Sequence, residues 1–117
     1  MSVPSQRQEV TYDKNTPLES VFRNSIARLL DFLILNQNFD YSPAEISRIT
    51  EVPLRTAQRA IQHLVEKGLI KESRPVGNTT MYILNPDSTL AGVFREYVKA
   101  AINLNIDQAL ATKLAEQ

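Results

Sequence analysis

The chain contains no cysteine, only one histidine, and three glycines among 117 residues. The absence of cysteine excludes disulfide bonds and thiolate metal sites, and it fits a reducing compartment. Three glycines do not supply a glycine-rich phosphate-binding loop, and one histidine without a cluster of metal-ligating residue types offers little for a catalytic centre. We therefore expect no cofactor, no metal and no enzymatic activity.

Long hydrophobic runs are also missing. No segment approaches about 18 consecutive apolar residues, and no basic start followed by an apolar run opens the chain. We expect a soluble, cytoplasmic protein with no membrane partner. Thirteen basic residues balance thirteen acidic ones, so any attraction to a polyanion must come from the local distribution of charge and not from the total.

The first part of the chain divides into a polar arm and a helical segment. Residues 1–15 show neither helical nor strand periodicity, which predicts a flexible arm. In "TPLE", Thr16 can cap a helix, Pro17 suits its first position, and Glu19 can complete a capping box. Apolar residues then recur every three or four positions to about Asn36, which predicts one helix with a single core-facing stripe. The stripe consists of Leu18, Val21, Phe22, Ile26, Leu29, Leu30 and Leu33.

Two further helices follow around a tight turn. "SPAE" at residues 42–45 repeats the capping-box chemistry and predicts a short helix. Pro53 disfavours helical geometry at the residue before it, so the short helix must end there and a new one begin. The new helix is expected over 53–67, ending at Gly68, which suits the left-handed conformation.

After Gly68, the spacing of apolar residues changes from that of a helix to that of β-strands. "LIKESR" and "TTMYIL" are strand-like runs around the turn former "PVGN", which predicts a β-hairpin over 70–84. Helical spacing returns at Leu90 and lasts nearly to Gln117. We expect an arm at 1–15, a domain at 16–85 and a terminal helix at 86–117.

This order of elements is typical of a winged helix-turn-helix, in which the third helix enters the DNA major groove. The expected fold class is mainly α with a small β-hairpin, a winged helix-turn-helix plus a long C-terminal dimerisation helix. At about 100° per residue, the apolar positions of 53–67 fall on one side, and Arg55, Arg59 and Gln62 fall on the other. Core and reading face are thus predicted to be separate.

The polar set suits DNA chemistry. Arginine can pair with guanine and glutamine with adenine through two hydrogen bonds each, while Thr56 can bind a phosphate. On the hairpin, Lys71 and Arg74 can follow the backbone or enter a minor groove. The residues expected to contact DNA are Arg55, Thr56, Gln58, Arg59, Gln62, His63, Lys71, Arg74, Asn78 and Thr79. The alternative is an amphipathic helix whose arginines and glutamines simply face water.

The last helix carries two apolar stripes, which one helix cannot bury against its own small domain. One stripe is expected to dock on the domain and the other on a second copy, giving a homodimer whose half-sites lie about 10 bp apart. The expected interface residues are Leu90, Phe94, Tyr97, Ala101, Leu104, Ile106 and Leu110. The alternative is that both stripes pack within one chain.

The stretches "FDYSPAEISRITEVPLRTAQRAIQHLVEKGLI" and "RPVGNTTMYILNPDS" resemble archaeal winged-helix transcription regulators, broadly similar to the MarR and ArsR groups. The resemblance covers Ser25 to about Leu90. It implies a homodimeric, DNA-binding regulator of transcription with helix 53–67 on the bases and the hairpin on the backbone. Leu54 stands where that family usually has a polar residue, and it can meet a thymine methyl group or pack. The resemblance names neither the controlled genes nor the direction of control.

A rival interpretation is a winged helix used as a protein-protein interaction module of a transcription or scaffold complex. Arg55 and Arg59 would then meet acidic side chains. Binding to a duplex, unlike this alternative, should weaken steeply with ionic strength. A small-molecule effector is a further possibility, but Tyr97 and Asn103 are equally explained by packing and exposure, so no ligand is assigned.

Overall fold

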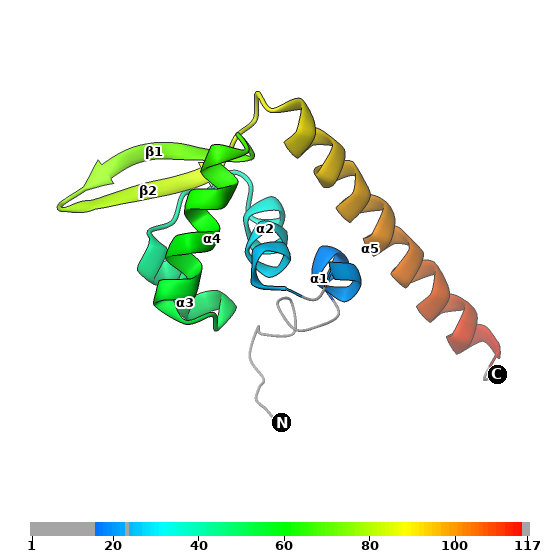
Figure 1. Ribbon diagram of the computed structural model, residues 1–117. Coiled ribbons are helices and arrows are strands. Elements are labelled where there is room, and N and C mark those ends of the chain that lie inside the picture. Colours follow the sequence, from blue (N-terminus) through cyan, green and yellow to red (C-terminus); the bar gives the residue numbers. More distant parts are fainter. Residues whose placement is uncertain (1–15, 23, 116–117) are drawn as a thin grey trace.

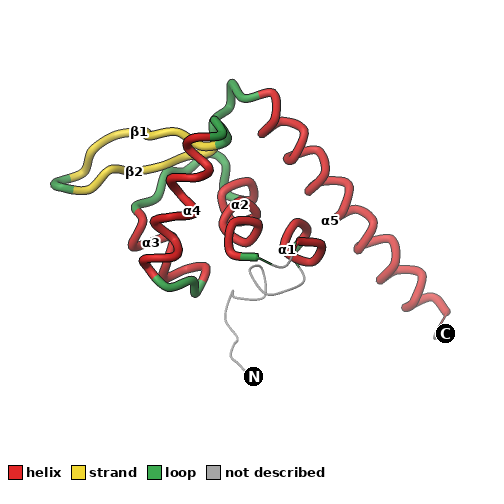
Figure 2. Tube along the Cα trace, in the orientation of Figure 1, coloured by secondary structure: helices red, strands yellow, loops and turns green. Residues whose placement is uncertain are grey.

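The computed structural model describes residues 16–22 and 24–115, with the backbone alone described at 109–112 and 114–115. The expected arm at 1–15 lies outside the described residues. The fold is mainly helical, with one two-stranded antiparallel hairpin and a long C-terminal helix (Figure 1, Figure 2). The elements are α1 (Pro17–Phe22), α2 (Ser25–Leu35), α3 (Pro43–Thr50), α4 (Leu54–Glu66), β1 (Ile70–Val76), β2 (Thr79–Leu84) and α5 (Thr89–Ala115).

The single helix expected from Thr16 to Asn36 is wrong, because the chain forms two helices there. Asn24 has an extended backbone, and its side chain accepts the Ala27 amide N–H at 2.8 Å, which starts α2 anew. Asparagine favours this capping position over a helix interior, since its short amide competes for nearby backbone groups. The break changes the phase of the stripe, so Val21 and Phe22 are more than half exposed.

The short helix α1 is joined to α2 by a buried carboxylate. Asp31 of α2 accepts the amide N–H groups of Leu18 and Glu19 at 2.9 and 3.0 Å. Arg28 of α2 pairs with the Glu19 carboxylate at 2.9 Å, and its Nε donates to the Thr50 carbonyl at the end of α3. Three helices therefore meet at polar side chains of α2.

The capping box predicted at Ser42 is confirmed, with Ser42 Oγ accepting from the Glu45 amide and the Glu45 carboxylate accepting from Ser42. The turn after α3 places Glu51 at φ 61°, a left-handed conformation that a side chain disfavours. Pro53 caps α4, so the helix begins one residue later than expected. Gly68, at φ 74°, follows its end as predicted.

The core lies between α2, α3, α4 and the base of the hairpin. Ala57 and Ala60 are buried on the inner side of α4, and their small size lets this helix lie close to α2 and α3. Each fully buried large apolar side chain contributes about 1.5–3 kcal/mol to folding. The innermost large apolar residues are Leu29, Phe32, Leu33, Ile46, Leu64, Ile70, Leu84 and Val98.

The hairpin contains a β-bulge. Glu72 pairs with Tyr82 and Pro75 with Thr80, so Ser73 and Arg74 together oppose one residue of β2. The tip turns at Gly77, at φ 62°. The hairpin projects from the helical body (Figure 1).

The long helix α5 docks through one row of side chains. Ala91 and Val98 are buried, and Phe94 and Ile102 pack partly buried against the core. Of these four residues, only Phe94 is among the expected interface residues, because α5 crosses α1 and α2 at an angle that apolar spacing alone does not predict. Its C-terminal half extends beyond the body (Figure 2). Among the described residues, no helix combines the length and apolarity needed to cross a membrane.

Candidate nucleic-acid interface

The outward side of α4 carries the polar residues that the sequence placed there. Arg55, Gln58, Arg59 and Gln62 are all exposed. None of their side chains has a hydrogen-bond or ion-pair partner within the described part of the chain. The opposite side of the helix is buried in the core. The predicted separation of core and outward face in this helix is confirmed. Four long polar side chains are therefore free to reach a partner.

The surface on both flanks of α4 is hollowed. On one flank, Thr56, Arg59 and His63 line a hollow of about 350 Å³ with the start of α2. On the other flank, a hollow of about 480 Å³ lies between α4 and the hairpin, and its lining includes Gln58 and Gln62. The outward edge of α4 is therefore a ridge with a depression on each side.

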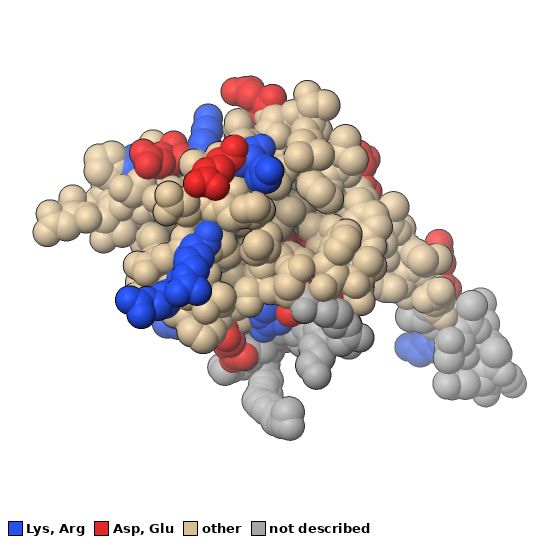
Figure 3. Space-filling view, viewed as in Figure 1, with Lys and Arg blue, Asp and Glu red and all other residues tan. Residues whose placement is uncertain are grey.

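Charge is unevenly distributed along this ridge. Arg55 and Arg59 lie in the N-terminal half of α4, whereas Glu66 lies at its C-terminal end and Glu72 on the adjacent hairpin lines the same hollow. Figure 3 shows basic side chains over the half of α4 near α3, and both acidic and basic side chains over its other end and the hairpin. A polyanion would therefore approach the N-terminal half of α4 most favourably.

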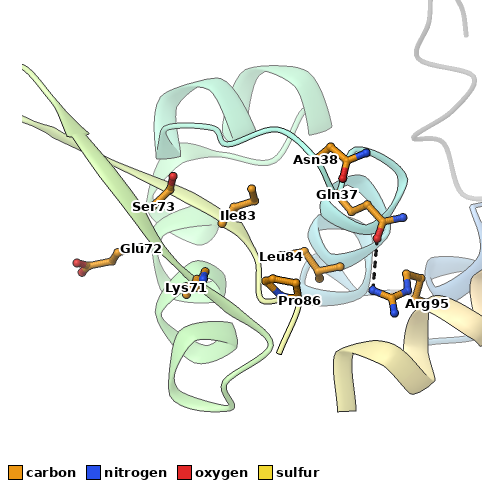
Figure 4. A pocket seen from close by; sticks show the side chains of 9 residues that line it. All are labelled: Gln37, Asn38, Lys71, Glu72, Ser73, Ile83, Leu84, Pro86 and Arg95. Atoms are coloured by element: carbon orange, nitrogen blue, oxygen red, sulfur yellow. Dashed lines mark hydrogen bonds between the residues drawn. The ribbon is translucent and has the colours of Figure 1, made fainter. Parts of the chain in front are cut away.

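Lys71 does not share a surface with α4. It lines a hollow of about 430 Å³ beside α5, where Arg95 donates to the Gln37 side-chain oxygen at 3.4 Å (Figure 4). Glu72, the next residue, lines this hollow as well as the hollow beside α4. The sequence predicted Lys71 as a contact of the hairpin with a DNA backbone or minor groove, and it did not single out Glu72.

Arg74 already has a partner within the chain. Its Nε lies 2.8 Å from Asp40 Oδ2 and its Nη2 3.2 Å from Oδ1, while Ser73 Oγ donates to the same carboxylate at 2.8 Å. The Arg74 guanidinium, and then the Ser73 hydroxyl, lower the pKa of Asp40 from 3.8 to about 2. The group of three is thus fully formed above about pH 4 and is lost only as the pH falls through about 2. The expected basic excess of the hairpin is smaller than the sequence indicated, because Asp40 balances Arg74.

At the tip of the hairpin, Asn78 and Thr79 are exposed as expected. The tip lies at the end of the projecting strands (Figure 1), a few residues beyond the bulge. It offers amide, hydroxyl and backbone donors without a charge.

A second exposed surface runs along α5. Leu90, Val93, Tyr97 and Leu104 are all exposed, and at 100° per residue they fall within an arc of about 60°. We call these four residues the α5 face. The expected interface residues Phe94 and Ala101 are partly buried toward the body, and Ile106, though exposed, points to nearly the opposite side of the helix. The expected contribution of Leu110 lies outside the described side chains.

Comparison with known proteins adds no assignment to this geometry. No protein-family model, curated protein or solved structure matches the chain. Within the described residues, no three histidine, aspartate or glutamate side chains gather where they can hold a metal ion. The resemblance to winged-helix regulators therefore stays an expectation, and the functional assignment depends on the arrangement of α4, the hairpin and α5.

Proposed function

We propose that this protein is a winged helix-turn-helix regulator of transcription that binds double-stranded DNA sequence-specifically as a homodimer. The observation that carries the proposal is the α4 ridge, where Arg55, Gln58, Arg59 and Gln62 project without partners between two hollows. An α-helix fits the major groove of B-DNA, and arginine and glutamine match the edges of guanine and adenine there. The order α3, turn, α4 and hairpin supports the same assignment.

The charge pattern sets the direction of approach. Arg55 and Arg59 are drawn toward the duplex, whereas at the other end of α4 Glu66 and Glu72 are repelled by its phosphates and Lys67 offsets only part of this repulsion. We infer that α4 enters the groove with its N-terminal half deepest and its C-terminal end tilted away. Leu54, the first residue of α4, is 45% exposed and is thereby available to contact a thymine methyl group.

Other polar side chains complete the contact with the backbone. Thr56 and His63 lie along the edge of α4 that faces the start of α2, where a phosphate strand beside the groove would pass. Asn78 and Thr79 at the hairpin tip reach a backbone or a minor groove further along the duplex. These contacts fix the position of the protein, whereas sequence is recognised by α4.

The α5 face supports the homodimer. Leu90, Tyr97 and Leu104 are spaced by seven residues, with Val93 between the first two, which is the spacing of a helix-helix seam. A stripe of large apolar residues exposed along one helix is typical of an interface. Two-fold pairing through this face would present two copies of α4 to one side of the duplex.

The dimer is tested by placing charge in the seam. Tyr97→Glu combined with Leu104→Glu should convert the protein from a dimer to a monomer, because each carboxylate would be desolvated beside its copy. Sedimentation velocity at tens of micromolar protein measures the change. The matched control is Lys99→Glu with Asn103→Glu, which adds two carboxylates off the α5 face. A monomeric parent protein, or a dimer that survives the seam substitutions, would contradict this interface.

Selection from a random duplex pool tests the function itself. We expect a nearly palindromic consensus with half-sites about 10 bp apart. Affinity for this site should fall steeply between 50 and 200 mM salt, as phosphate contacts require. Failure to enrich any sequence, together with salt-independent binding to a protein partner, would favour a protein-protein interaction module instead.

A further inference from the structure

The β-bulge in the hairpin directs two adjacent side chains at one carboxylate. Ser73 and Arg74 are the two residues that oppose a single residue of β2, and both bind Asp40. In a regular strand, neighbouring side chains point to opposite faces and cannot share a partner on one side. The extra residue in the bulge removes that restriction and bends the strand at the same point.

Asp40 is held in place independently of this contact. The next residue, Tyr41, pairs with Tyr82 of β2 through two backbone hydrogen bonds of 2.9 and 2.8 Å. The Tyr41 ring packs on Phe32 of the core, with ring centroids 4.7 Å apart. The Asp40 side chain is only 14% exposed, whereas that of Arg74 is 62% exposed. The backbone that carries the carboxylate is therefore fixed to the core and to the base of the hairpin, and the outer hairpin is the part that the carboxylate positions.

We propose that Asp40, Ser73 and Arg74 form a clamp that sets the direction of the outer hairpin relative to α4, so that Arg74 is a positioning residue and not a phosphate contact. The inference depends on the proposed function, because it concerns how the hairpin tip is presented to a duplex. Beyond the bulge, the outer hairpin is joined only by the pairs Pro75–Thr80 and Val76–Thr79. A two-stranded ribbon of this length has little rigidity of its own, so a contact at its bend decides where the tip points.

Duplex affinity at several salt concentrations distinguishes positioning from contact. Arg74→Ala and Asp40→Asn should each weaken binding by about 2-fold to 10-fold, the expected penalty of ordering a loosened segment at the interface. The double variant should bind no worse than whichever single variant binds more weakly, because both substitutions break the same contact. The slope of log affinity against log salt should stay unchanged in all three. The comparison variant Arg59→Ala, which removes a cation placed at the duplex, should reduce that slope by up to about one.

The opposite pattern would overturn the clamp. If Arg74 contacts a phosphate and Asp40 merely competes for it, Arg74→Ala lowers the salt slope by about one. In that case Asp40→Asn strengthens binding, because the guanidinium is released to the DNA. Additive losses in the double variant would likewise show that the two residues act separately.

A measurement without DNA keeps this test separate from that of the proposed function. Because the chain has no cysteine, spin labels attach only to the cysteines that are introduced. We choose Asn78→Cys at the hairpin tip and Ala44→Cys at an exposed position of α3. Labelled chains are diluted with unlabelled protein, so that only distances within one chain are measured. The distribution of distances between the two labels should be narrow, and it should broaden with Asp40→Asn or Arg74→Ala. Lys71→Ala, which removes a cation outside the clamp, should leave it narrow. Unchanged widths in both clamp variants would refute the clamp, whereas absence of DNA binding would refute the proposed function alone.

Discussion

Alanine at both Arg55 and Arg59 is expected to lower affinity for the selected duplex by at least about 30-fold, and by up to about 10⁴-fold. Each bidentate arginine–guanine contact discriminates by about 1–3 kcal/mol, and each 1.4 kcal/mol changes affinity tenfold. Both side chains are exposed and without partners in the described part of the chain, so their removal leaves the core intact. Titration of labelled duplex at fixed salt, with the fold checked by circular dichroism, measures the loss.

Two controls give this result its meaning. Lys99→Ala removes an exposed cation on α5, away from the α4 ridge, and should leave affinity within about twofold. Lysine at both Arg55 and Arg59 keeps the charge but loses the planar two-bond geometry, so binding to random DNA should persist while the preference for the consensus falls. Unchanged affinity in the double alanine variant would show that another surface binds the duplex.

The helices and the outward face of α4 could be predicted from the sequence because they depend on local patterns. The Ser42–Glu45 box, the Pro53 break and the Gly68 stop each involve residues within one turn of one another. The inward position of Ala57 and Ala60 follows from helical period alone. Local chemistry of this kind is readable without knowledge of the rest of the fold.

The remaining features required contacts between distant segments. Asp31 lies in the middle of an apolar run. Its role depends on a hydrogen bond with Leu18 of α1, which lies 13 residues earlier in the chain, and local patterns do not predict that contact. Asp40 and Arg74 are 34 residues apart, so local patterns predicted Arg74 as a free cation. In α5, the side chains that dock on the body depend on how this helix crosses α1 and α2. The spacing of apolar residues alone does not predict that crossing.

Asp31 occupies an unusual position for a carboxylate. Its side chain is fully buried, and it accepts hydrogen bonds from the amides of Leu18 and Glu19 and from the side chain of Thr16. Burial nevertheless raises its pKa above the usual 3.8, outweighing the bonds and the nearby Arg28 charge. A raised pKa means that the folded chain binds this proton more tightly than the unfolded chain. The contribution of Asp31 to stability is therefore largest below about pH 3.8 and declines as the pH rises through the folded-state pKa.

Replacement of Asp31 by alanine is expected to destabilise the fold by about 2–6 kcal/mol at neutral pH, since two amide groups lose their buried acceptor and each such loss costs about 1–3 kcal/mol. Asp31→Asn retains one acceptor oxygen but turns an NH₂ group toward the second amide, so its stability should lie between those of the parent chain and Asp31→Ala. It should also lack the pH dependence that the raised pKa of Asp31 gives the parent chain. Urea unfolding at one protein concentration measures these differences. Asp87→Ala, at an exposed carboxylate, should change stability by no more than about 0.5 kcal/mol. A loss equally small in Asp31→Ala would show that α1 does not depend on this carboxylate. A large loss would explain how α1, which packs on both α2 and α5, keeps the long helix against the body.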